Sequence, residues 1–183
     1  MSVWWVLAAI VAVMLIFVLG AVALGRRRSA RLRESFGPEY DRTLERHDDQ
    51  REAEAELQRR RNRHRRLDIR PLTPEAREAY AARWTETQRG FADAPASAVE
   101  HADALLAEVM RERGYPVQDF DQRSADLSVD HPDVISNYRA AHGISVANQR
   151  GKASTEDLRT AMVHYRALFT ELLEAEPAET SRT

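Results

Sequence analysis

The chain has 183 residues, a formal net charge of −2 at pH 7 and no cysteine. The lack of cysteine excludes disulfide bonds, thiolate metal sites and a cysteine nucleophile. The charge is unevenly distributed, because residues 26–70 hold 15 basic against 10 acidic residues, whereas residues 71–183 hold 12 basic against 19 acidic residues. We therefore expect a basic segment followed by an acidic domain.

The first predicted element is an apolar helix over residues 3–24, VWWVLAAIVAVMLIFVLGAVAL, which contains no charged side chain. Twenty-two helical residues span about 33 Å, and the hydrocarbon core of a bilayer is about 30 Å thick. The match predicts a transmembrane anchor over residues 1–25. Trp4 and Trp5 would lie in the headgroup layer at one end of it.

Arginines follow the apolar stretch at once and predict its orientation. Arg26, Arg27 and Arg28 begin a basic juxtamembrane segment over residues 26–37. Because basic flanks stay on the cytoplasmic side, we expect a single-pass protein of the cell membrane with its N-terminus outside and the remaining chain in the cytoplasm.

A cleaved signal peptide is the alternative interpretation of the same stretch. Residues 21–23, Ala-Val-Ala, resemble a cleavage site, and cleavage would leave a secreted or periplasm-facing helical domain. The apolar stretch is longer than that of a usual signal peptide, and no basic segment precedes it. Both departures favour the anchor.

Residues 38–70 predict a long polar stalk helix. Gly37 and Pro38 break the preceding helix, and residues 39–67 then hold good helix formers without Gly or Pro. Apolar residues are sparse and form no heptad repeat. Such a helix is typical of a solvated connector and not of a coiled coil.

A basic patch occupies the far end of this segment, at residues 59–66, RRRNRHRR. Three interpretations are open: its arginines bind the phosphates of a nucleic acid, lie on an anionic membrane, or dock on the acidic domain that follows. We do not expect nucleic acid as the main partner, since no recognition motif or interleaved aromatic residue accompanies the run. The arginines of the patch are Arg59, Arg60, Arg61, Arg63, Arg65 and Arg66.

Residues 71–175 predict an acidic bundle of about four main antiparallel helices. The helices are expected to begin near residues 73, 95, 130 and 154, with a short additional helix within residues 119–127. Each carries an apolar face at helical spacing, and no period-2 pattern predicts a strand. The expected fold class is all-α, and we expect a disordered tail over residues 176–183.

Titratable side chains in this domain suggest no reaction. No H-E-x-x-H, G-x-S-x-G, Walker or G-x-G-x-x-G motif occurs. Clustered carboxylates are ligands for Ca²⁺ or Mg²⁺, but the residue order of an EF-hand is absent. We therefore expect no enzyme, no cofactor and no metal site. The clustered carboxylates belong to Asp119, Asp121, Asp126, Asp130 and Asp133.

Four sequence blocks carry a resemblance to a known family: FGPEYDRT, LDIRPLTPEAR, RERGYPVQDFDQRSADLSVDHPDVISNYRAAH and STEDLRTAMVHYRALFTELL. They resemble uncharacterised single-span, membrane-anchored helical proteins of high-GC Gram-positive bacteria. The resemblance covers most of residues 36–175. It implies a membrane location and a bacterial lineage, but no activity and no functional residues.

The expected function is therefore recognition of a protein partner by a membrane-tethered helical domain. Its rival is binding of nucleic acid or anionic lipid through the basic patch. Small residues four positions apart, at Ala8 and Ala12 and at Ala21 and Gly25, also leave a homodimer through the apolar helix open.

Overall fold

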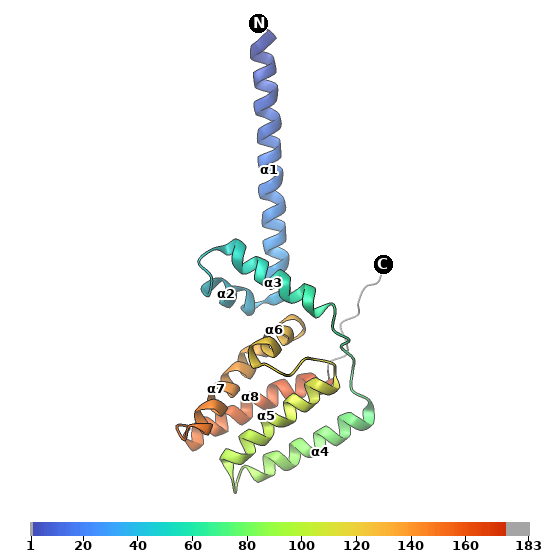
Figure 1. Cartoon of the computed structure of the whole chain (residues 1–183), viewed down its shortest axis with the longest axis vertical. Coiled ribbons are helices and arrows are strands. Elements are labelled where there is room, and N and C mark those ends of the chain that lie inside the picture. The colour runs from blue at the N-terminus through green and yellow to red at the C-terminus, as the bar shows by residue number, and fades with distance from the viewer. Residues whose placement is uncertain (1, 175–183) are drawn as a thin grey trace. The chain divides into compact units, whose positions relative to one another are not determined.

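A computed structural model describes the backbone of residues 2–174 and their side chains except those of residues 2, 3, 5, 6 and 8–12. Within these residues it contains helices and no strand, which confirms the all-α fold class. The expected tail over residues 176–183 lies outside the described part. The helices are α1 (Ser2–Phe36), α2 (Pro38–Glu45), α3 (Gln50–His64), α4 (Pro74–Gly90), α5 (Pro95–Glu112), α6 (Phe120–Asp130), α7 (Ile135–Gln149) and α8 (Thr155–Glu174) (Figure 1).

The chain divides into two compact units, residues 1–57 and residues 58–183. The boundary falls inside α3, whereas the sequence predicted a boundary at residue 70. The basic patch therefore belongs to the C-terminal unit and not to a separate stalk.

In the N-terminal unit, the apolar stretch and the basic segment that follows form one continuous helix, α1, of 35 residues. Among the residues whose side chains are described, no helix combines the length and the apolar character that a membrane crossing requires. The transmembrane helix expected from the sequence therefore stays a prediction.

The expected stalk helix over residues 38–70 is wrong, because α2 ends at Glu45 and α3 begins at Gln50. Asp49 explains the break: its Oδ1 accepts the Arg51 N–H at 3.0 Å, and its carbonyl accepts the Ala53 N–H at 3.1 Å. Aspartate competes for backbone donors in this way and therefore starts helices better than it continues them. This segment contains too few apolar residues for their spacing to indicate where one helix ends and the next begins. Two of the few, Tyr40 and Leu57, are buried.

The C-terminal unit is a helical bundle with one apolar core, as predicted. α5 packs against α4, α7 and α8, α8 packs against α7, and α6 lies against α7. The ring of Trp84 in α4 stacks on that of Phe169 in α8, with centroids 4.7 Å apart. The buried core residues of α5, α7 and α8 recur at helical spacing, as the apolar faces predicted, and include Val99, Ala102, Leu106, Val109, Met110, Ile135, Tyr138, Ala141, Leu158, Met162, Tyr165, Phe169 and Leu172.

Helix starts in this unit follow the capping residues in the sequence. Thr73 Oγ1 accepts the Ala76 N–H at 3.2 Å, and Pro74 occupies the first turn of α4. Before α8, Ser154 Oγ accepts the Asp157 N–H at 3.2 Å, and Asp157 Oδ2 accepts the Ser154 N–H at 2.8 Å. This reciprocal pair satisfies two backbone donors that would otherwise lack partners.

Gly114 fixes the linker before α4 against the end of α5. Its φ of +98° lies in the left-handed region, and a Cβ placed there would come within 2.2 Å of the Asp68 carbonyl oxygen. The neighbouring Arg113 carbonyl accepts the Arg70 N–H at 2.9 Å. Only glycine permits this backbone conformation and this close approach together.

Candidate functional site

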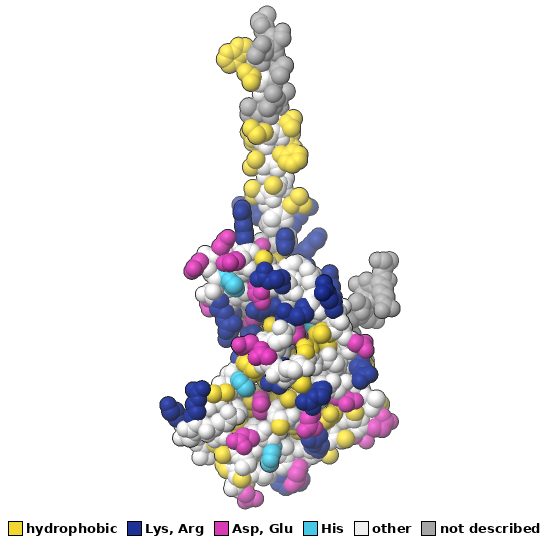
Figure 2. All heavy atoms as spheres, viewed as in Figure 1, with side chains coloured by type: hydrophobic (Ala, Val, Ile, Leu, Met, Phe, Trp, Pro, Cys, Tyr) yellow, Lys and Arg dark blue, Asp and Glu magenta, His cyan; other side chains and the backbone are white. Residues whose placement is uncertain are grey.

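Those predicted anchor residues whose side chains the structure describes lie on an exposed helix surface. Trp4 is 79% exposed, whereas the Trp5 side chain lies outside the described residues. Every large apolar side chain described between residues 13 and 24 is exposed, from 48% at Val22 to 81% at Phe17. Arg26, Arg27 and Arg28 are exposed directly after this stretch, and Figure 2 shows arginine side chains gathered where the apolar ones end.

The six arginines of the basic patch do not share one environment. Arg60 is buried, whereas Arg59, Arg65 and Arg66 are exposed. Arg61 donates to Gln58 Oε1 at 2.7 Å within α3. The run is therefore not a continuous cationic surface.

Two residues of this run instead bind the acidic helix α6. Arg63 Nε lies 3.0 Å from Asp126 Oδ1, and His64 Nε2 lies 2.7 Å from Asp130 Oδ2. Gln122 Nε2 donates to the second Asp126 oxygen at 2.8 Å. Of the three interpretations of the basic patch, these contacts favour docking on the protein's own acidic segment.

Asp130 is the centre of a hydrogen-bonded network. It was expected to start a helix, but it ends α6 and accepts bonds from His64 and from the Tyr115 hydroxyl, the latter at 2.6 Å. The network continues from Tyr115 Oη to His131 Nε2 at 3.5 Å and from His131 Nδ1 to Glu171 Oε1 at 3.0 Å. It thus joins the end of α3, the loop after α5, the end of α6 and α8.

Burial and these contacts shift the pKa values of the groups in the network. Burial alone would raise the pKa of Asp130, but the bonds from His64 and Tyr115 outweigh it and hold that pKa below its usual value. Burial lowers the pKa of His131 more than Glu171 raises it. Burial also raises the pKa of the Tyr115 hydroxyl, reinforced by the charge of Asp130. At neutral pH the network therefore holds a carboxylate and a neutral His131.

A second polar cluster lies where α5, α7 and α8 meet. The Tyr165 hydroxyl donates to Asp103 Oδ1 at 2.8 Å, and His142 Nδ1 lies 3.7 Å from the same oxygen. The His142 ring stacks on Phe120 with centroids 3.6 Å apart. Burial would raise the pKa of Asp103, but His142 and Tyr165 outweigh it, so this carboxyl stays ionised. The cluster thus supplies the Asp103 carboxylate with a hydrogen-bond donor within the bundle.

Three of the five acidic residues that suggested a cation site have other roles. The Asp119 side chain accepts the Gln122 N–H at 2.8 Å and caps α6. Asp126 and Asp130 are engaged by Arg63 and His64. In the described part of the chain, no three His, Cys, Asp or Glu residues are placed to hold a metal ion together.

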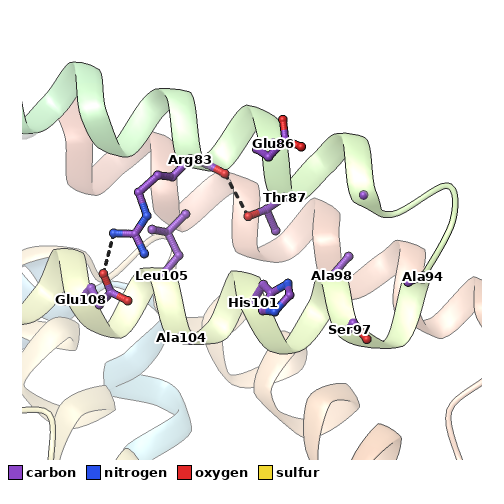
Figure 3. Close-up of a pocket in the computed structure, with 11 residues that line it drawn as sticks. Arg83, Glu86, Thr87, Ala94, Ser97, Ala98, His101, Ala104, Leu105 and Glu108 are labelled. Carbon is purple, nitrogen blue, oxygen red and sulfur yellow. Dashed lines mark hydrogen bonds and ion pairs between the residues drawn. The ribbon is translucent and has the colours of Figure 1, made fainter.

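An open groove of about 500 Å³ lies between α4 and α5. Figure 3 shows Arg83 reaching from α4 to Glu108 of α5 at one end, where Nη1 and Oε2 are 2.6 Å apart. The wall of the groove on α5 is formed in part by the exposed residues Ser97, His101 and Ala104. Small side chains on both helices leave the space between them unfilled.

Sequence reasoning missed this groove and the partners of Arg63 and His64, because both depend on segments that only folding brings together. Ser97 and Ala104, seven positions apart, lie on one face of α5 and are a local signal of a small-residue face. No protein-family model, curated protein or solved structure matches the chain.

Proposed function

We propose that this chain is a membrane-tethered interaction domain, anchored by α1, which presents its C-terminal unit to a protein partner in the cytoplasm. The observation that carries the proposal is the apolar surface of α1. Between residues 13 and 24 its large apolar side chains are about half to four-fifths exposed. An apolar surface of this extent is stable only when lipid or protein covers it.

Lipid explains the distribution of these side chains better than a protein surface does. Residues 13–19 are consecutive and all exposed, and consecutive helical positions point in different directions around the axis. A single protein partner covers one side of a helix, whereas a bilayer covers all sides. A homodimer through α1 remains compatible with this anchor, because lipid would cover the outer sides of the pair.

The energetics favour insertion of the whole apolar segment. Of residues 3–24, thirteen are Val, Leu, Ile or Phe. Each favours a bilayer by about 0.3–0.6 kcal/mol at the helix centre, so together they supply at most about 4–8 kcal/mol. One central arginine costs about 3 kcal/mol. Two central arginines are therefore needed to cancel the insertion.

The anchor is tested with the double variant Val13→Arg with Phe17→Arg, expressed as the full chain in bacterial cells. We expect the unchanged chain to stay with the membrane after alkaline carbonate extraction and the double variant to be released. The control Thr160→Arg with Val163→Arg adds the same charge on exposed positions of α8 and should stay with the membrane. Release of the unchanged chain would overturn the anchor.

The groove between α4 and α5 is the surface that we propose for the protein partner. Its volume of about 500 Å³ lies within the usual range for binding pockets, about 300–1,000 Å³. The small side chains of its wall allow close approach, and the exposed His101 and Glu86 offer polar contacts at its rim. This combination suits an amphipathic partner helix lying along α5.

The partner surface is tested by placing a photoreactive amino acid at Ser97 in living cells. We expect one protein adduct from Ser97, and its loss when Ala104→Glu fills the groove with a charged side chain. Thr160, exposed on α8, is the control position. The same adduct from Thr160, or an adduct from Ser97 that persists with Ala104→Glu, would place the partner elsewhere.

A further inference from the structure

We propose that the N-terminal unit binds the phosphate of an anionic phospholipid head group in a pocket between α1 and the start of α3. The pocket has a volume of about 450 Å³. Arg26 and Ser29 line it from α1, and Arg51 and Glu54 line it from α3. The inference rests on the proposed membrane anchor.

The position of the pocket along α1 matches the head-group layer of a bilayer. The apolar stretch ends at Leu24, and the pocket begins at the next residue and reaches Ser29. Four helical residues rise about 6 Å. The head-group layer on each side of the hydrocarbon core is about 5–7 Å thick. With the apolar stretch in the core, the pocket therefore opens at the depth of the lipid phosphates.

The acidic side chains of the pocket have partners within the protein. Glu54 Oε1 accepts bonds from the Tyr40 hydroxyl and from Gln50 Nε2, both at 2.8 Å. Burial would raise the pKa of Glu54, but hydrogen bonds, together with the charge of Arg28, outweigh it and keep the carboxylate ionised. Asp49 Oδ1 accepts the Arg51 N–H at the start of α3.

The two arginine side chains of the pocket lack such partners. Within the described residues, no hydrogen bond or ion pair joins the guanidinium of Arg26 or Arg51 to another side chain. Guanidinium groups bind phosphate oxygens in charge-assisted pairs, which are about twice as strong as neutral hydrogen bonds. A lipid phosphate between Arg26 and Arg51 would supply the missing anion.

The walls of the pocket are joined directly. Gln50 Nε2 donates to Ser29 Oγ at 3.4 Å, and Ser29 Oγ donates to the Gly25 carbonyl at 3.1 Å. The start of α3 is thus held against α1 at the level of Arg26. The lining of the pocket holds Asp49 and Glu54 against Arg26 and Arg51, so the net charge of the pocket itself does not attract an anion. Direct contact with one phosphate should therefore dominate the binding.

The full chain in vesicles that contain spin-labelled phosphatidylglycerol tests the pocket. We expect the electron spin resonance spectrum to report selective association of the labelled lipid with the chain. The double variant Arg26→Gln with Arg51→Gln should weaken this association about five- to tenfold. The matched control Arg27→Gln with Arg31→Gln removes the same charge from exposed residues outside the pocket, and should weaken it less than about twofold.

The outcomes separate the pocket from the anchor. Failure of every chain to enter vesicles would contradict the anchor itself. Equal losses in both double variants, with insertion intact, would show general electrostatic attraction and overturn the pocket. Inorganic phosphate that abolishes the selectivity of the inserted chain would identify a site for free phosphate and overturn the assignment to a lipid.

Discussion

Arg63 and Asp126 form an ion pair across 63 positions of the chain, with 3.0 Å between Nε and Oδ1. The Asp126 side chain is fully buried, whereas that of Arg63 is 40% exposed. A buried carboxylate is stable only when a cation and hydrogen bonds compensate it. The pair therefore joins the C-terminal end of α3 to α6, and it pairs the charge of Arg63 with a carboxylate of the protein itself.

Loss of Arg63 should destabilise the C-terminal unit. Arg63→Gln leaves the Asp126 carboxylate buried without its cation, which costs about 3–5 kcal/mol for a fully buried pair. Because Arg63 is partly exposed, we expect the free energy of unfolding to fall by about 2 kcal/mol. Urea unfolding of the full chain in detergent micelles measures this loss. The exposed Arg65→Gln should cost less than about 0.5 kcal/mol. Equal effects of the two changes would mean that the ion pair contributes nothing.

Acidification should destabilise the same unit through His131. Its pKa lies below the ordinary value of 6.5 in the folded chain, so the unfolded chain binds a proton more readily. His131 therefore contributes stability above about pH 6.5 and loses it as the pH falls below that value. The groups that face it are Tyr115, Asp130 and Glu171, together with the positive charge of Arg113, and Asp130 stays ionised in this range because its pKa is lowered.

The pH dependence is checked by thermal unfolding of the full chain between about pH 7.5 and pH 5.5. We expect a decline in melting temperature on acidification that is smaller in His131→Gln. His101→Gln changes a histidine that is exposed, and should leave the decline unaltered. A decline of the same size in all three proteins would assign it to other groups.

Two glycine substitutions should have opposite effects on the free energy of unfolding. Gly114→Ala forces a side chain into a left-handed backbone and against the Asp68 carbonyl, so we expect a loss of about 3 kcal/mol or more. Gly143 lies inside α7, and a methyl group there would meet no side chain and no other element within 4 Å. Gly143→Ala should therefore stabilise the bundle by about 0.5–1 kcal/mol. Urea unfolding measures both, and a tolerated Gly114→Ala would refute the close approach.

Features set by neighbouring residues could be predicted from the sequence. Helix starts were expected near residues 73 and 154, and the side chains of Thr73 and Ser154 cap the helices there, because a cap depends on only three or four positions. The buried faces of α5 and α8 followed from helical periodicity for the same reason. Gly143 lies within α7, and the helix continues through it because an internal glycine costs only about 1 kcal/mol.

Features set by distant partners could not be predicted in this way. Asp130 resembles a helix start in the sequence, but its partners His64 and Tyr115 place it at the end of α6. The groove between α4 and α5 depends on which faces of the two helices meet. In the sequence Arg63 looks like the other arginines of the basic patch, whereas in the structure it pairs with the buried Asp126. Local composition contains none of these pairings.

The most direct test of membrane anchoring is a labelling measurement in intact cells. The chain has no cysteine, so Ser2→Cys and Thr183→Cys each introduce one unique thiol. With a membrane-impermeant maleimide, we expect the thiol at position 2 to be labelled in intact cells and the thiol at position 183 only after lysis. Labelling of position 183 in intact cells, or recovery of a chain that has lost its apolar N-terminal segment, would contradict the anchor and its orientation.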